Sequence, residues 1–124
     1  MRRTIRTIAF ALAAMFAVTA CTPEELALYL DTTAEVRHVL SNDDLSRLRH
    51  CESTDNYEAV SRSGLYRGAY QFDQTTWDDV AGRFFPWLTG IDPVEAAPWW
   101  QDAMARALWS ERGSQPWPRC GKRV

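Results

Sequence analysis

Apolar positions recur at helical spacing in the first half of the chain. Thr22, Pro23 and Glu25 have the pattern of a helix start with a capping box, which predicts a helix over residues 22–40. The apolar face of this helix would be formed mainly by Leu26, Tyr29, Leu30, Thr33, Val36 and Leu40. The pattern leaves open whether this helix packs on a folded domain or only separates that domain from a membrane.

A second helix is predicted to start at residues 41–44. Its sequence places Leu45, Leu48 and Glu52 on one face, at spacings of three and four residues. The turn-forming residues 53–56 should end it. Glu52 is therefore predicted to lie on the apolar face of this helix, near its C-terminal end.

The rest of the chain alternates short helices with irregular segments. Residues 57–72 should form a loop or a short β-hairpin, followed by a short helix capped by Asp73 or Thr75 and stopped by Gly82. One helical turn capped by Asp92 is expected within residues 84–98, and the clearest helix then ends at Gly113. The pattern predicts a mainly helical α+β fold.

The first 20 residues have the pattern of an export signal. Basic residues near the start precede an apolar run over residues 8–18, which is too short to span a bilayer permanently. Residues 18–21 also fit a lipobox, in which Cys21 receives a lipid and becomes the N-terminus. Residues 21–44 would then be a lipidated lead-in and residues 45–124 the domain. The alternative is a secreted protein with a free or intermolecularly paired Cys21.

Three cysteines in an exported chain leave one without an intramolecular partner. Cys51 and Cys120 bracket most of the chain after the lead-in, and a disulfide between them would stabilise the fold by roughly 4 kcal/mol. Cys21 is then the spare cysteine, and lipidation would give it a use. The cysteine pattern thus favours a membrane-anchored lipoprotein over a secreted protein.

The charge distribution excludes some partners. Without Arg2, Arg3 and Arg6, the 14 basic residues fall to 11 against 16 acidic ones, so the exported chain is acidic. No basic stripe indicates a nucleic-acid site. His38 and His50 lack a ligand-spaced cluster, so neither a metal nor a cofactor is expected.

Glu52 is the candidate catalytic residue. A carboxylate at a helix C-terminus faces the negative end of the helix dipole, and on an apolar face it also loses hydration. Both effects raise its pKa, as a general acid in glycosidic cleavage requires. The alternative is a solvated glutamate at a fraying helix end.

Four ordered motifs resemble the transglycosylase-like domain of resuscitation-promoting factors. They extend over about 80 residues, and their order and spacing match: Cys51-Glu52-Ser53, Gly64-Leu65-Tyr66-Arg67-Gly68-Ala69-Tyr70-Gln71-Phe72, Thr76-Trp77, and Trp117-Pro118-Arg119-Cys120-Gly121. The resemblance implies a shortened lysozyme-like fold with a Cys51–Cys120 disulfide. It also implies cleavage of the β-1,4 bond between N-acetylmuramic acid and N-acetylglucosamine.

The resemblance assigns roles to individual residues. Glu52 would be the catalytic acid, Gln71 would hydrogen-bond the sugars, and Tyr66 and Trp77 would line the cleft. An aromatic residue at the helical position of Trp77 is, however, more often part of the core. The family usually has two glycines where this chain has Thr54-Asp55, so the loop beside Glu52 is expected to differ.

The resemblance also suggests peptidoglycan as the partner of a monomeric enzyme that acts beside a cell-wall endopeptidase. Asp55 and Asp73 are explained by a turn and a helix cap, so no second catalytic carboxylate is evident. This favours a lytic transglycosylase with one catalytic glutamate over a hydrolase. The competing hypothesis is an inactive peptidoglycan-binding module. No Ser-His-Asp arrangement supports an esterase or peptidase.

Overall fold

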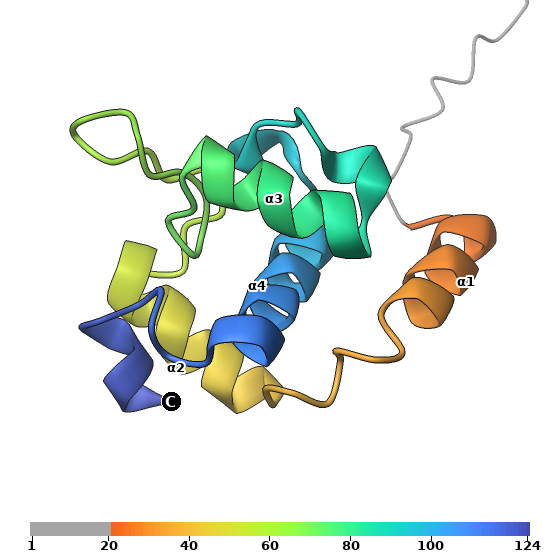
Figure 1. Cartoon of the computed structure of the whole chain (residues 1–124), viewed down its shortest axis with the longest axis horizontal. Coiled ribbons are helices and arrows are strands. Elements are labelled where there is room, and N and C mark those ends of the chain that lie inside the picture. Colours follow the sequence, from red (N-terminus) through yellow and green to blue (C-terminus); the bar gives the residue numbers. More distant parts are fainter. Residues whose placement is uncertain (1–20) are drawn as a thin grey trace, which may run out of the picture.

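The computed structural model describes residues 21–124, which form helices joined by short connections (Figure 1). The helices are α1 (Pro23–Thr32), α2 (Asn42–Ser53), α3 (Gln74–Phe84) and α4 (Pro98–Arg112), with 3-10 turns η1 (Pro86–Leu88), η2 (Pro93–Glu95) and η3 (Cys120–Arg123). Between α2 and α3, isolated antiparallel bridges pair Arg67 with Val60 and with Phe72. The predicted mainly helical fold, with a loop or short hairpin and one disulfide, is confirmed.

The predicted export signal, residues 1–20, lies outside the described residues. Within residues 21–124, no helix has the length and apolar character needed to cross a membrane. Cys21 lies just before α1 and forms no disulfide.

The first helix is shorter than predicted, because it ends at Thr32 instead of continuing to Leu40. The Thr32 and Thr33 hydroxyls donate hydrogen bonds of 2.6 Å to the carbonyl oxygens of Leu28 and Tyr29. β-Branched residues that bond back to the preceding turn favour a helix end over its continuation. Residues 33–40 then follow a series of turns.

The segment after α1 packs on the rest of the domain. Tyr29 meets the ring of Trp100 edge to face at 5.4 Å, and Thr33, Val36 and Leu40 are buried. Figure 1 shows α4 in the middle of the fold, with α1 on one side of it and α2 on the other. The lead-in therefore contributes side chains to the core.

A buried arginine of α4 connects this segment to the start of α2. Arg106 donates from Nε to the carbonyl oxygen of Leu40 at 3.0 Å and from Nη2 to Oδ1 of Asn42 at 2.8 Å. Ser41 caps α2 in a capping box with Asp44, so the helix begins where the sequence predicts. The N-terminus of α2 is thereby held on α4.

Helix α3 starts where the sequence predicts but does not stop there. Asp73 caps it and accepts from the Thr76 backbone amide at 2.8 Å, whereas Gly82 lies inside the helix, which runs to Phe84. The prediction that Gly82 stops the helix is wrong. Trp77, Val80 and Ala81 are buried and hold this last turn in the core, which outweighs the weak helix propensity of glycine.

The chain beyond α4 returns to α2. Gly113 ends α4 with a positive φ of 56°, and η3 then packs against α2, where Cys120 is bonded to Cys51. A Cβ atom on Gly121 would lie 2.8 Å from atoms of Ser114, so only glycine allows this close approach. The disulfide therefore joins α2 to a tightly packed C-terminal segment.

Candidate active site

A cavity of about 650 Å³ opens at the C-terminal end of α2. Three segments that are distant in sequence form its walls: the end of α2, the loop between α2 and α3, and the segment after α4. The lining residues are Cys51, Glu52, Tyr66, Gln71, Gln115, Pro116, Trp117, Pro118, Arg119 and Cys120. Residues 21–44 contribute none of them.

Glu52 lies on the wall that the last turn of α2 provides, and its side chain is half-buried. Burial raises the pKa of its carboxyl group, because the charged form loses hydration. Among residues 21–124, no other acidic side chain lines this cavity. The cavity thus has one carboxyl group, and its raised pKa allows it to stay protonated at a higher pH than a solvated glutamate.

The backbone beside Glu52 is held on both sides. Cys51, the preceding residue, is bonded to Cys120. Ser53, the following residue, donates its hydroxyl to the carbonyl oxygen of Ala69 at 2.8 Å and accepts from the Asn56 amide at 3.1 Å. These contacts fix the backbone from which the Glu52 side chain extends.

The loop after Glu52 has a backbone conformation that favours glycine. Thr54 and Asp55 have positive φ values of 56° and 62°, in the left-handed region. Asp55 accepts from Arg49 Nε at 3.1 Å, and its own amide donates to the Arg49 carbonyl oxygen at 3.3 Å. Thr54 and Asp55, which stand where the resembled family usually has two glycines, therefore occupy a backbone region that favours glycine.

A polar network lies behind the last turns of α2. Asp102 of α4 accepts from the Tyr57 hydroxyl at 2.8 Å, the Tyr70 hydroxyl at 2.6 Å and Arg49 Nη1 at 3.3 Å. Burial, together with the neighbouring Asp102 carboxylate, raises the pKa of both tyrosines, so they remain hydrogen-bond donors. The network ties α2 and the following loop to α4.

Tyr66 and Gln71 line the same cavity as Glu52. Tyr66 is 48% exposed, so much of its ring is accessible from solvent. Gln71 has a positive φ of 54°, and its side-chain Nε2 donates to the Gly68 carbonyl oxygen at 3.0 Å. This bond orients the amide while its oxygen remains available to a ligand.

Trp77 does not lie where the resemblance suggested, because it lines neither this cavity nor the one beside it. Its side chain is fully buried in the core, where Nε1 donates to the Leu88 carbonyl oxygen at 2.9 Å. It also meets the Phe72 ring edge to face. The role of Trp77 is therefore structural, and its assignment to the cleft is corrected.

Trp117 lines the cavity instead, although the sequence analysis assigned it no site role. Nε1 of Trp117 donates to the Tyr70 carbonyl oxygen at 3.0 Å, and its ring stacks on Trp109. Gln115 and Arg119 were missed as well. The available signal was the motif around Cys120, whose bond to Cys51 brings these residues beside Glu52.

A second cavity of about 230 Å³ adjoins the first and shares Tyr66, Gln71, Pro116 and Trp117 with it. Asp73 lines this second cavity, but its two carboxylate oxygens accept from the backbone amide and hydroxyl of Thr76. It acts as the cap of α3, as predicted. Residues 21–124 contain no group of three or more side chains suited to hold a metal ion.

Comparisons with known proteins identify the family to which this chain is similar. The family model described as "Transglycosylase-like domain" matches residues 40–120. "Probable transglycosylase SceD" of Staphylococcus aureus strain MRSA252 is 37% identical over 76 residues, which are 61% of this chain and 32% of that protein. "Probable transglycosylase SceD" of Staphylococcus carnosus strain TM300 is 35% identical over 80 residues, or 64% and 33%.

The chain spans about a third of the length of these curated relatives. No solved structure matches it. The family match covers most of the chain and includes both cysteines of the disulfide, Glu52 and every residue that lines the main cavity. The chain therefore belongs to the transglycosylase-like domain family.

Proposed function

We propose that this chain cleaves the glycan strands of peptidoglycan at the β-1,4 bond between N-acetylmuramic acid and N-acetylglucosamine. The reaction is that of a lytic transglycosylase, with Glu52 as its one catalytic carboxyl group. One observation carries this proposal: Glu52 is the only acidic side chain that lines the main cavity among residues 21–124, and burial raises its pKa. Family membership supports the reaction class.

The first step uses the protonated form of Glu52. Its carboxyl group donates a proton to the glycosidic oxygen as the bond from that oxygen to C1 of the muramyl residue breaks. The N-acetylglucosamine portion leaves as an alcohol, and an oxocarbenium-like centre develops at C1. Partial burial of Glu52 favours this step because it raises the pKa of the carboxyl group, which therefore keeps its proton to a higher pH than a solvated glutamate does.

The second step uses the carboxylate that remains. The C6 hydroxyl oxygen of the muramyl residue bonds to C1, and its proton passes to Glu52, which closes a 1,6-anhydro ring. Water is not consumed, and the carboxyl group returns to its starting state. A hydrolase would instead pair its acid with a second carboxylate, but Asp55 is bound to Arg49 and Asp73 caps α3.

Tyr66 and Gln71 are proposed to bind the sugars. The accessible ring of Tyr66 offers a flat apolar face to a pyranose, and the amide of Gln71 can bond to N-acetyl or hydroxyl groups. Trp117 would support the wall, since its own N–H is already bonded within the protein.

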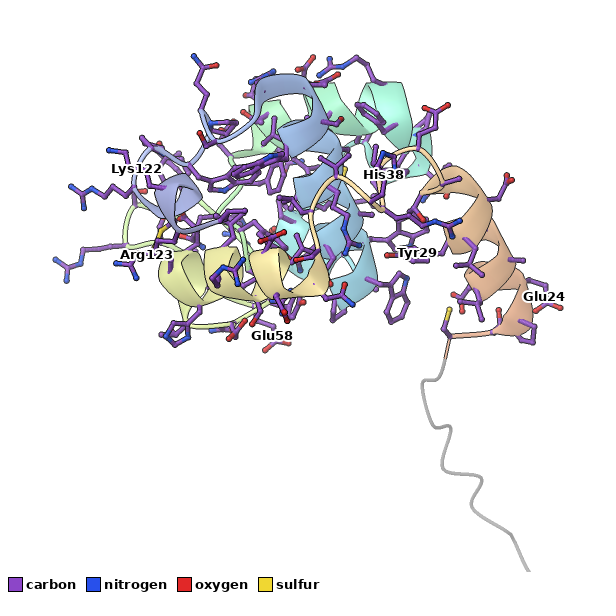
Figure 2. The ribbon with its side chains drawn as sticks, turned by 90° about the horizontal axis from the view of Figure 1, so that it is seen from below. Glu24, Tyr29, His38, Glu58, Lys122 and Arg123 are labelled. Atoms are coloured by element: carbon purple, nitrogen blue, oxygen red, sulfur yellow. A yellow bond between two sulfur atoms is a disulfide. The ribbon has the colours of Figure 1, made fainter. Side chains whose placement is uncertain are left out.

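The test is mass spectrometry of the fragments that the oxidised protein releases from purified peptidoglycan. Glu52→Gln is the test variant, and Glu58→Gln is its matched control. Glu58 is exposed, lies six residues away and lines neither the main cavity nor the one beside it, so this control makes the same chemical change (Figure 2). We expect anhydro-muramyl products from the wild type and Glu58→Gln, and none from Glu52→Gln.

Other products would revise the proposal. Reducing-end products that depend on Glu52 would establish a hydrolase and require a second carboxylate. A folded, disulfide-bonded protein that binds glycan strands and releases nothing would support the inactive binding module instead.

We also propose that the chain is exported and anchored through a lipid on Cys21. Cys21 forms no disulfide and lies directly before α1. Growth of an expressing bacterium with an alkyne fatty acid should label the wild-type protein, while Cys21→Ser should remain unlabelled and pass into the soluble fraction. Equal labelling of both would disprove lipidation at this residue.

A further inference from the structure

The main cavity contains one basic side chain, Arg119, in addition to the catalytic candidate Glu52. Arg119 comes from the C-terminal segment, whereas Glu52 comes from α2. The two residues therefore place an acidic and a basic side chain on walls of the same cavity that come from different parts of the chain.

Arg119 differs from many other arginines of the fold because it forms no ion pair within residues 21–124. Arg67 pairs with Asp92, Arg83 with Asp79 and Glu111, and Arg112 with Asp79. Arg119 has no such partner, and its side chain is exposed. Its guanidinium group is thus available to a ligand that enters the cavity.

The backbone of Arg119 is well held. The next residue, Cys120, is bonded to Cys51, and the amide of Gly121 donates to the Trp117 carbonyl oxygen at 2.8 Å. The backbone that carries the guanidinium group is therefore already ordered, and binding a ligand costs only side-chain freedom.

A sugar strand that fills the cavity would displace water from Arg119. An unpaired guanidinium group then loses hydration without compensation, whereas a carboxylate on the ligand can form paired charge-assisted hydrogen bonds with it. Peptidoglycan carries carboxylates on its stem peptides, and on the muramyl lactyl group where the peptide has been removed. The exported chain is itself acidic, so a local positive group also offsets repulsion from this anionic polymer.

We propose that Arg119 is a specificity-determining residue that binds a carboxylate of the peptidoglycan strand beside the scissile bond. This inference rests on the proposed function, because it concerns the substrate of the same cavity. It predicts that the protein prefers strands with free carboxylates to the same strands with these groups converted to neutral amides.

The test compares kcat/KM on native and amidated strands for the wild type, Arg119→Gln and Lys122→Gln. Lys122 is the matched control because it lies in η3, the 3-10 turn that directly follows Arg119, is exposed and does not line the cavity (Figure 2). Both variants remove one positive charge. We expect the wild type and Lys122→Gln to prefer native strands by about tenfold, and Arg119→Gln to lose that preference.

Two results would overturn the inference. The first is that Arg119→Gln retains the preference for native strands. The second is that Lys122→Gln loses this preference to the same extent as Arg119→Gln, which would indicate general charge attraction instead of a contact with Arg119. Strands with stem peptides and strands freed of them by an amidase distinguish the two carboxylates. If the preference depends on Arg119 for strands with stem peptides, the bound carboxylate lies on the peptide. If it depends on Arg119 for strands freed of them, the bound carboxylate is that of the lactyl group.

Binding measurements separate this inference from the proposed reaction. Dissociation constants for native and amidated strands are measured in the Glu52→Gln background, with and without Arg119→Gln. If no variant cleaves glycan but binding still prefers native strands through Arg119, the reaction is wrong and the inference stands. A protein that cleaves both strands equally well refutes the inference alone, and one that binds neither strand refutes both.

Discussion

The hydroxyl group of Ser53 donates a hydrogen bond of 2.8 Å to the backbone carbonyl oxygen of Ala69. This contact joins the last residue of α2 to the loop that carries Tyr66 and Gln71, so it links two walls of the cavity. The residue that precedes Ser53 is Glu52, and its position therefore depends on a contact made by its neighbour.

Ser53→Ala should reduce the free energy of unfolding by about 1 kcal/mol, because the Ala69 carbonyl oxygen and the Asn56 amide each lose a partner. Glycan cleavage should fall by more than this loss of stability explains. The measurements are urea unfolding and initial rates at a temperature where the variant is fully folded. Ser46→Ala, in the same helix, is the control and should leave the rate unchanged.

Thr54→Gly should stabilise the protein by roughly 0.5 to 1 kcal/mol, because its φ of 56° lies in the left-handed region that favours glycine. Thr75→Gly is the matched control. Thr75 is exposed in the first turn of α3, where the same substitution should destabilise by a few tenths of a kcal/mol. Thermal unfolding measures both effects, and equal shifts in the same direction would contradict the conformational argument.

Glu52→Gln should make the protein more stable at neutral pH. Because burial raises the pKa of Glu52, the folded protein keeps its proton over a pH interval in which the unfolded chain has released it. Folding therefore becomes less favourable as the pH rises through that interval. The glutamine variant avoids this cost, so it should gain roughly 0.5 kcal/mol at pH 7, a small value because the group is partly solvated.

The gain should disappear below about pH 4, where Glu52 is protonated in both states. Urea unfolding of the wild type and Glu52→Gln at both pH values provides the measurement. Glu58→Gln, at an exposed position, is the control for the change of side chain. A loss of stability in Glu52→Gln at pH 7 would mean that the carboxylate has a stabilising partner.

Removal of the disulfide by the double substitution Cys51→Ser, Cys120→Ser should cost about 4 kcal/mol, because the bond closes a loop with a sequence separation of 69. Cleavage should also be lost at temperatures where the variant stays folded, since the segment after α4 forms one wall of the cavity. Circular dichroism and glycan cleavage, measured on both proteins, test this. Full activity in a folded, reduced protein would show that the wall does not need the bond.

Local sequence determined much of the secondary structure and the identity of the main candidate. The capping residues Ser41, Asp73 and Asp92 begin helices where their side chains predicted, because a cap bonds to amides only two or three residues away. Cys51 and Cys120 are bonded, as the cysteine pattern indicated. Glu52 was identified from the motifs, and its raised pKa agrees with a position on an apolar helix face.

Tertiary packing decided the rest. Whether Trp77 faces the core or a cleft depends on which elements pack against α3, and Leu88 and Phe72 bury it. Gly82 remains helical because its helix is held in the core. Trp117 and Arg119 line the same cavity as Glu52 only because the chain returns to α2 after α4. These last two residues lie more than 60 positions from Glu52 along the chain, and local propensity carries no information about such a separation.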